Sequence, residues 1–292
     1  MRYIVGYAPN KHGAQAVALA SALALTQGAE LEIVHVLDGP RPSDTDFAEE
    51  RMVQDVRTGR VTEWLRGGAD LVPDGVTAHT RLVYADSIAE GLIEAARELN
   101  AALIVVSAAR AAPLNRFMIG SVANSLLHAA HVPVALVPSG YEQPEKIIRM
   151  TAAIGSREGA RTLLDVVLAA ATRRGVPLRL VSLVSFDHEG PDDSAAVAQS
   201  ARDHAREVLD EAVKSVGAQA QVTAVVAEGS TIEDAAESLP WDDGEVAIIG
   251  SSRLAEHRKI FMGSTANKIL RVLPIPLIVV PRSMPADAPL EL

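Results

Sequence analysis

The sequence predicts an α/β protein with two doubly wound, five-stranded and mostly parallel sheets related by tandem duplication. Three observations lead to this fold class. Apolar stretches alternate with amphipathic ones, the whole pattern recurs once, and stretches such as LIVV and AIIG are short and entirely apolar. Alternating strands and helices build parallel sheets covered on both faces, and wholly apolar strands fit the buried centre of such a sheet. Five strands per half indicate a flavodoxin-like or Rossmann-like arrangement.

The duplication is visible in three pairs of segments that share one offset of 143 residues. The pairs are GSVANSLL at 120–127 with GSTANKIL at 263–270, VPVALVP at 132–138 with IPLIVVP at 275–281, and LIVVS at 103–107 with VAIIG at 246–250. So long a period indicates duplicated domains and excludes a solenoid. The stretch at 139–145 carries Gly, Pro and charges, as expected of a linker. The expected units are domain 1 at 1–140, domain 2 at 146–284 and an irregular tail at 285–292.

Each element of the first half follows from its local pattern. An apolar strand opens the chain, and the Ala-rich helix after it ends at Gly28. Asp86 or Ser87 can cap a later amphipathic helix, because their side chains accept hydrogen bonds from free backbone N–H groups. The strands are expected at 3–7, 30–37, 75–83, 102–107 and 132–137, and the helices at 12–27, 46–68, 86–99 and from 120 onward. In the second half the strands are expected near 147–154, 178–184, 220–227, 245–250 and 275–280.

Composition excludes several classes of function. Hydrophobic residues make up 48% and charged residues 22%, the ordinary mix of a soluble globular protein, and the net charge of −10 disfavours a nucleic-acid or anionic-membrane surface. There is no cysteine, which excludes disulfides, Cys-ligated zinc, iron–sulfur clusters and thiol nucleophiles. No apolar stretch approaches the roughly 20 residues of a bilayer span. We therefore expect a soluble, cytoplasmic protein.

The loop after strand four of each half is the candidate ligand site, since ligands of such sheets lie beyond the carboxyl ends of the strands. In the second half, Gly250 ends the strand, Arg253 follows in the loop, and Gly263-Ser264 opens a helix whose free N–H groups suit phosphate oxygens. The first half offers Ser107, Arg110, Gly120 and Ser121 at the matching positions. The alternative is an ordinary turn and helix start with solvated arginines.

These features closely resemble the universal stress protein family, specifically its two-domain members, over nearly the whole chain. The family's loop, G-2x-G-9x-G-[ST], matches the second half with Arg253 in place of the second glycine. The first half matches less well, because Ser107 and Arg110 replace two glycines. The resemblance implies a fold like that of adenine-nucleotide alpha-hydrolases. It also implies that these positions wrap the phosphates of ATP or AMP, with or without Mg²⁺.

Nucleotide-binding members of the family also carry an Asp at the end of strand one, which this chain lacks. Ala8 and Ile154 stand in its place, with Asn10 or Ser156 as a polar substitute, while Leu37 and Val184 keep the adenine pocket apolar. The candidate residues of the first half are Ala8, Asn10, Leu37, Ser107, Arg110, Gly120, Ser121 and Val122. Those of the second half are Ile154, Gly155, Val184, Gly250, Arg253, Gly263, Ser264 and Thr265.

No further motif points to catalysis or to a metal. The P-loop, the G-x-G-x-x-G fingerprint and the G-x-S-x-G elbow are absent, and His128 and His131 have no third ligand beside them in sequence. The leading interpretation is a non-catalytic stress-response regulator that binds adenine nucleotide, mainly in the second half. The alternatives are an interaction protein with a degenerate site and, less favoured, a nucleotide hydrolase. The two halves could pair through their last strands, with a protein partner unidentified and a homodimer left open.

Overall fold

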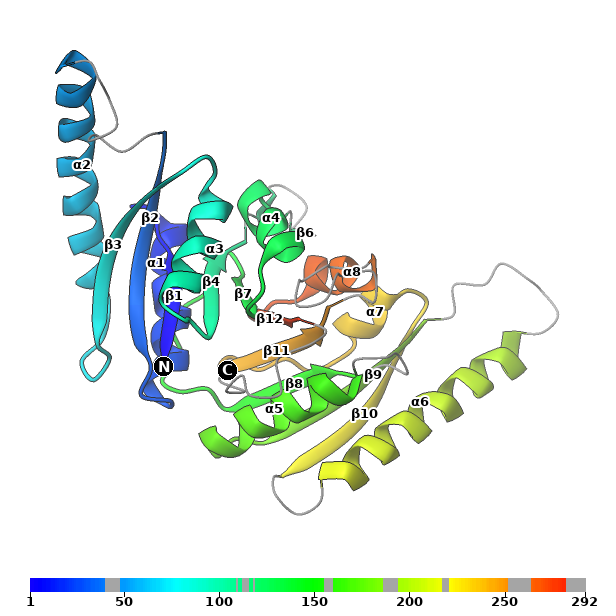
Figure 1. Cartoon of the computed structure of the whole chain (residues 1–292). Coiled ribbons are helices and arrows are strands. Elements are labelled where there is room, and N and C mark those ends of the chain that lie inside the picture. The colour runs from blue at the N-terminus through cyan, green and yellow to red at the C-terminus, as the bar shows by residue number, and fades with distance from the viewer. Residues whose placement is uncertain are drawn as a thin grey trace.

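The computed structural model describes residues 1–39, 48–108, 110–111, 116–117, 119–154, 160–185, 194–216, 221–251 and 264–281. Ten strands form one continuous sheet in the order β10-β9-β8-β11-β12-β7-β4-β1-β2-β3 (Figure 1). The strands of the first half are β1 Arg2–Gly6, β2 Glu30–Asp38, β3 Ala78–Ala85, β4 Leu103–Ser107 and β7 Val134–Val137. Those of the second half are β8 Arg149–Ala153, β9 Leu178–Ser185, β10 Val222–Gly229, β11 Glu245–Gly250 and β12 Leu277–Val280.

Each half repeats one strand order, which is that of the Rossmann arrangement rather than the flavodoxin arrangement. Within the ten-stranded sheet, all strand pairs inside a half are parallel. A short antiparallel hairpin of β5 Arg110–Ala111 and β6 Arg116–Phe117 lies in the loop after β4. The tandem α/β fold predicted from the sequence is therefore confirmed.

The halves join through β7 and β12, the last strand of each. These two strands pair antiparallel, with Leu136 opposite Leu277 and Val134 opposite Val279. The predicted pairing of the two halves through their last strands is confirmed. The result is a ten-stranded sheet in place of two separate five-stranded ones.

Helices cover both faces of this sheet. They are α1 Lys11–Leu25, α2 Ala48–Ala69, α3 Ile88–Glu98, α4 Ser121–Ala129, α5 Ala160–Arg174, α6 Ser194–Val216, α7 Ile232–Glu237 and α8 Ser264–Val272. One buried cluster lies between the sheet and α1, α2, α5 and α6, and another lies beneath α3, α4 and α8. Both clusters are mainly aliphatic and include residues of both halves, so the halves share their core. No described helix has the length and apolarity needed to cross a membrane.

Helix starts and stops largely follow local signals. Ser87 is the N-cap of α3, as predicted, because its hydroxyl accepts a hydrogen bond from the Glu90 N–H at 3.2 Å. The first helix spans Lys11–Leu25, slightly shorter at its end than predicted. Gly28 follows in the left-handed region at φ +63°, a conformation that terminates helices and suits glycine.

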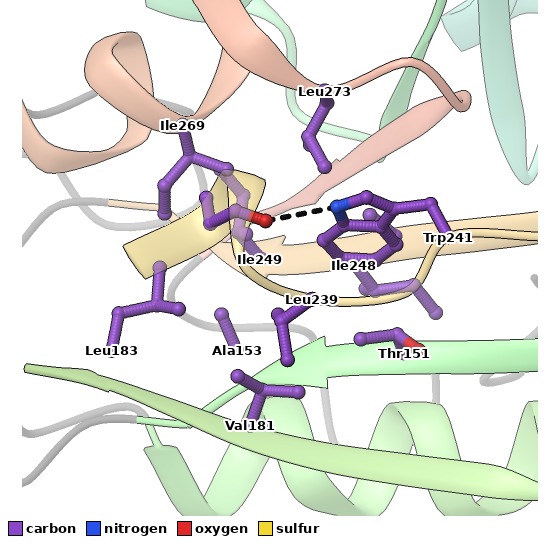
Figure 2. A pocket seen from close by; sticks show the side chains of 12 residues that line it. Thr151, Ala153, Val181, Leu183, Leu239, Trp241, Ile248, Ile249, Ile269 and Leu273 are labelled. Atoms are coloured by element: carbon purple, nitrogen blue, oxygen red, sulfur yellow. Dashed lines mark hydrogen bonds between the residues drawn. The ribbon is translucent and has the colours of Figure 1, made fainter. Parts of the chain in front are cut away.

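The second half departs from the first beneath α7. This helix has six residues where α3 has eleven, and the chain then turns so that Leu239 and Trp241 pack over the sheet. The Trp241 indole N–H donates to the Ala236 carbonyl at 2.9 Å. A hollow of about 280 Å³, counting its open mouth, remains beside these side chains (Figure 2). Its lining is apolar except for Thr151.

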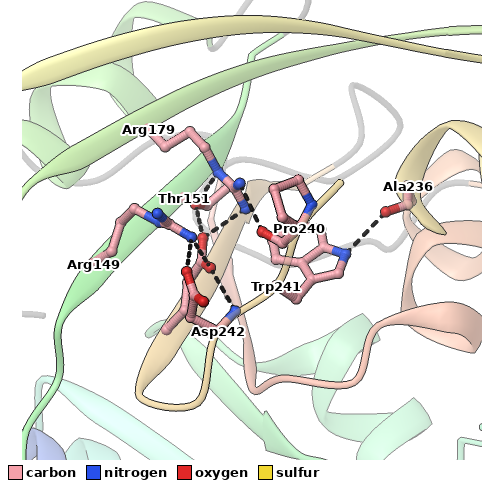
Figure 3. A network of polar contacts seen from close by, with 8 residues as sticks. Arg149, Thr151, Arg179, Ala236, Pro240, Trp241 and Asp242 are labelled. Atoms are coloured by element: carbon pink, nitrogen blue, oxygen red, sulfur yellow. Dashed lines mark hydrogen bonds and ion pairs between the residues drawn. The ribbon is translucent and has the colours of Figure 1, made fainter. Parts of the chain in front are cut away.

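A cluster of charged side chains is buried at the amino ends of the second-half strands (Figure 3). The Glu245 carboxylate is fully buried, accepts from Arg149 and Arg179 at 2.7 and 2.8 Å, and also contacts the Thr151 hydroxyl. The Arg179 guanidinium lies 4.8 Å from the centre of the Trp241 ring. Burial lowers the pKa of Arg179, and the hydrogen bond to Glu245 raises the pKa of Arg149. The cluster lies at the sheet edge opposite to the candidate ligand site.

Candidate functional site

The candidate site of each half lies where β1 or β8 ends beside β4 or β11. In the sheet, β1 and β4 are neighbours. The next strand beyond β1 is β2 and the next strand beyond β4 is β7, so the strand order reverses between β1 and β4. Ligands of doubly wound sheets bind at such a switch point, beyond the carboxyl ends of the strands. The structure brings the predicted residues of strands one and four to this edge.

In the first half, the start of α1 closes one side of the switch point. Asn10 is the N-cap of α1, and its side-chain oxygen accepts from the His12 and Gly13 N–H groups at 3.0 and 3.1 Å. The Asn10 side-chain oxygen therefore caps the start of α1. The sequence alone instead predicts Asn10 as a polar contact to a ligand. A Cβ on Gly13 would collide with the Ala8 carbonyl, so the strand-one loop packs directly on the first turn of α1.

The other side of the first-half site is the end of β4 and the start of α4. The Ser107 hydroxyl oxygen lies 3.5 Å from His12 Nδ1, which links the two sides of the switch point. Gly120 is the N-cap of α4 and provides no side-chain cap. Ser121 is exposed and Val122 half-buried, and the N-cap residue gives the first N–H groups of α4 no side-chain acceptor.

The ends of the second strands are apolar, as predicted. Leu37 and Val184 are 8% and 7% exposed. Next to Leu37, the His35 ring nitrogen Nδ1 lies 2.8 Å from the Tyr7 carbonyl oxygen, and its ring meets Trp64 edge-on with centroids 5.7 Å apart. His35 is therefore a satisfied interior histidine. Burial also raises the pKa of Tyr7.

In the second half, Gly250 is the exposed last residue of β11. The strand registers make it the equivalent of Ser107, because Val105 pairs with Val5 as Ile248 pairs with Ala152. A Cβ added to Gly250 would meet the Leu163 side chain at 3.7 Å, an ordinary contact. Packing against the described residues therefore does not require glycine at this position.

The remaining predicted residues are placed less completely. Ser264 and Thr265 open α8, and Arg110 lies in β5, but their side chains are not described. Outside the described residues lie Gly155, Ser156, Arg253 and Gly263.

The structure corrects the alignment of the two halves at strand one. The Tyr7 N–H donates to the Val34 carbonyl, and the Ile154 N–H donates in the same way to Val181. Ile154 therefore corresponds to Tyr7, and Ala8 corresponds to Gly155, so the sequence alignment of Ala8 with Ile154 is wrong by one residue. The cause is that loop lengths differ between the halves, so that one offset does not hold along the whole chain.

Comparison with known proteins places this architecture. The model of the universal stress protein family matches residues 1–138 and 148–281. This chain belongs to the universal stress protein family. Universal stress proteins of Mycobacterium bovis and Mycobacterium tuberculosis are 27% identical to it over 297 residues, covering 96% of this chain and 100% of each relative.

Solved structures agree on the fold. A universal stress protein from Archaeoglobus fulgidus superposes with a TM-score of 0.68 at 16% identity, covering 97% of this chain and 98% of that one. A putative universal stress protein from Pseudomonas aeruginosa gives a TM-score of 0.59 at 18% identity, covering 96% and 92%. The family resemblance inferred from the sequence is confirmed.

Sequence reasoning missed two features of the site in this universal stress protein. His12 lies within reach of Ser107, and Gly13 allows the close approach of Ala8. The sequence held one signal that the start of α1 is unusual. Its first turn carries Lys11 and His12, where acidic residues are favoured. Among the described residues, no three His, Asp or Glu side chains converge to form a metal site.

Proposed function

We propose that this universal stress protein binds an adenine nucleotide, ATP or AMP, at the loop after strand four, mainly in its second half. The observation that carries the proposal is Gly250. It ends β11 at the switch point, is exposed, and could carry a Cβ at 3.7 Å from Leu163 without a clash. A glycine that packing does not require leaves the backbone open to close approach by a ligand.

The surrounding chemistry suits a phosphate chain. The N-terminus of α8 at Ser264 presents free N–H groups and the positive end of a helix dipole. Arg253 supplies a guanidinium from the same loop, and guanidinium groups bind phosphate oxygens in pairs. The buried side chains of Ile154 and Val184 offer an apolar surface to the adenine ring. Mg²⁺ would bridge phosphate oxygens without needing a dedicated protein ligand.

The first half is proposed as the weaker site. Ser107 replaces the strand-ending glycine, and its hydroxyl is directed towards His12 at 3.5 Å. Asn10 already accepts two hydrogen bonds from α1. The uncapped start of α4 at Gly120 is the part that still suits an anion.

A second candidate function is an interaction protein whose nucleotide site has decayed. The observation in its favour is strand one, where neither Ala8 nor its equivalent Gly155 supplies an acidic side chain and Asn10 is used as a helix cap. Both proposals describe a non-catalytic stress-response regulator. At the first-half site the Ser107 hydroxyl and His12 Nδ1 are 3.5 Å apart, and a turnover assay with ATP and Mg²⁺ tests directly whether this pair is catalytic.

The deciding experiment is calorimetric titration of folded, nucleotide-stripped protein with ATP and with AMP, each with and without Mg²⁺. The variant Gly263→Asp puts a carboxylate where phosphate would lie, and Gly120→Asp makes the same change at the equivalent position of the first half. We expect micromolar binding that Gly263→Asp abolishes and Gly120→Asp leaves nearly intact. Absence of heat with every nucleotide would support the interaction protein. Loss of binding in Gly120→Asp alone would move the site to the first half.

A further inference from the structure

A buried arginine joins the two halves far from the nucleotide loop. Arg174, the last residue of α5, is 9% exposed. Its Nη1 donates to the Leu23 carbonyl at 3.1 Å and to the Thr26 hydroxyl at 2.8 Å, both at the end of α1. The last turn of α1 has no basic residue of its own, so the second half supplies the cation that its helix dipole favours.

That contact engages only one of the three guanidinium nitrogens, Nη1. Arginine has five N–H donors, and the atoms Nε and Nη2 of Arg174 are buried with no hydrogen-bond partner in the described structure. These two atoms form the edge of the guanidinium that binds anionic oxygens in pairs. An unsatisfied charged edge is costly, because burial removes the water that would otherwise solvate it.

No carboxylate among the described residues balances this charge. Burial lowers the pKa of Arg174 most strongly, the Tyr3 hydroxyl raises it as a hydrogen-bonding neighbour of the guanidinium, and the like charge of Arg173 lowers it. Arginine nevertheless remains charged in proteins. The helix dipole of α1 offsets about half of one charge at most.

A second unsatisfied donor comes from the equivalent position of the first half. Gln27 precedes Gly28 as Arg174 precedes Gly175, and both glycines turn the chain at φ +63° and +64°. The Gln27 side-chain nitrogen Nε2 is also buried without a partner. Gln27 is the chain neighbour of Thr26, whose hydroxyl contacts Arg174. Unsatisfied donors from both halves therefore lie around the end of α1. A bound anion would accept hydrogen bonds from such donors.

We propose that a small monovalent anion binds between the two halves at the Nε–Nη2 edge of Arg174. The anion completes the hydrogen bonds of the guanidinium and neutralises its charge. It thereby stabilises the contact that holds the end of α5 against the end of α1. This site lies at the opposite end of α1 from Asn10 and the switch point, and it does not depend on nucleotide binding.

The thermal unfolding of the full chain in chloride and in gluconate, at the same ionic strength, tests the proposal. Gluconate serves as the reference anion because it is too large to enter the site. A bound ion stabilises the folded state by mass action, so we expect the Tm of the wild type to rise by about 2 °C. Arg174→Met should remove this chloride-dependent rise. Arg173→Met makes the same change at the exposed neighbouring residue and should keep it. An equal rise in all three proteins would reflect a general salt effect and overturn the proposal.

Crystals of the wild type grown in sodium bromide give a test that does not depend on the variant folding. We expect an anomalous peak within hydrogen-bond distance of Arg174 Nε and Nη2. A water molecule or a carboxylate of this chain at that edge, with bromide bound elsewhere or nowhere, would overturn the proposal.

Discussion

The two halves share one strand order but bury their charges at different positions. In the first half, Glu32 in β2 is the buried acid, with Arg81 at 3.1 Å and Arg2 at 3.9 Å. In the second half, Arg179 occupies the position of Glu32, because Leu31 pairs with Tyr3 as Leu178 pairs with Met150. The buried acid there is Glu245, at the start of β11. Both halves therefore bury an acidic side chain paired with a basic one at this sheet edge, but at different sequence positions. This is expected if the main requirement is that no buried charge is left unpaired.

The largest predicted effect follows from this contrast. Glu245→Gln leaves Arg179 buried and uncompensated, so we expect it to lower the free energy of unfolding by about 3–5 kcal/mol. Glu32→Gln should cost less than half as much, because its partner Arg81 is 35% exposed and water can solvate it. Urea denaturation of both variants measures the difference. Equal losses would show that the two clusters are energetically alike.

A double variant sharpens the same comparison. Replacing a buried ion pair by apolar residues of similar volume is often neutral. Glu245→Leu combined with Arg179→Met should therefore recover most of the stability that Glu245→Gln loses, in the same urea experiment. A double variant as unstable as the single one would assign the effect to Thr151 and Trp241, which also contact Arg179.

The helix after strand three differs between the halves by an exchange of small residues. Ala85 and Gly91 of the first half correspond to Gly229 and Ala235 of the second. A Cβ on Gly229 would collide with the backbone of α7, whereas a Cβ on Gly91 would meet the Val36 methyl group Cγ1 at 2.7 Å. The two helices therefore approach the sheet most closely at different points.

Alanine substitutions at these glycines should have unequal effects. We expect Gly229→Ala to cost about 2–3 kcal/mol, since helix backbone must move, and Gly91→Ala about 1 kcal/mol, since a side chain can rotate away. Chemical denaturation monitored by circular dichroism gives both values. A larger loss in Gly91→Ala would mean that α3 is the more rigidly placed helix.

The N-caps of the same two helices allow a smaller test. The Ser87 hydroxyl accepts from the Glu90 N–H, whereas Thr231 and Asp234 form a reciprocal capping box. Removing either cap should cost about 1 kcal/mol, with Thr231→Ala above Ser87→Ala because the box satisfies two donors and α7 has six residues. Matched thermal melts of the two variants check the order. The reverse order would show that neighbouring contacts hold α7 without its cap.

The smallest effect concerns pH. His131 follows α4, and burial together with the charge of Arg97 lowers its pKa. The unfolded chain then binds a proton more readily than the folded one, so stability falls as pH drops below the ordinary pKa of about 6.5. Pro274 occupies the equivalent place in the second half. We expect His131→Gln to reduce slightly the loss of Tm between pH 7 and pH 5, measured by thermal melts of both proteins at each pH, and an unchanged loss would contradict the assignment to His131.

The sequence was sufficient for the fold because its signals are local or repeated. The strand expected at 245–250 coincides with β11, and of the two predicted caps, Asp86 and Ser87, the structure uses Ser87. The buried cluster was not predicted, since Arg179 and Glu245 lie far apart in sequence and meet through strand register. Neither was the shortening of α7, because the segment after it has no periodic pattern of its own.

The strand order explains where the candidate residues lie better than the sequence explains what they contact. Ser107 and Gly250 end the strands at the switch point, as the strand order requires. The role of Asn10 could have been predicted, because an Asn before an Ala-rich helix is a common N-cap. The contact between Ser107 and His12 joins the end of β4 to the first turn of α1 and has no local signature.

The antiparallel pairing of β7 with β12 has a further consequence, because residues 138–148 tether the two halves within one chain. Two separate subunits that met through such strands would dissociate on dilution. Here the effective concentration of each half at its partner is set by the tether and not by expression level. The stoichiometry of two unlike halves is fixed at one to one, so each was free to change its charges and its strand-four loop without losing its partner. The chain is in effect an obligate heterodimer translated as a single polypeptide.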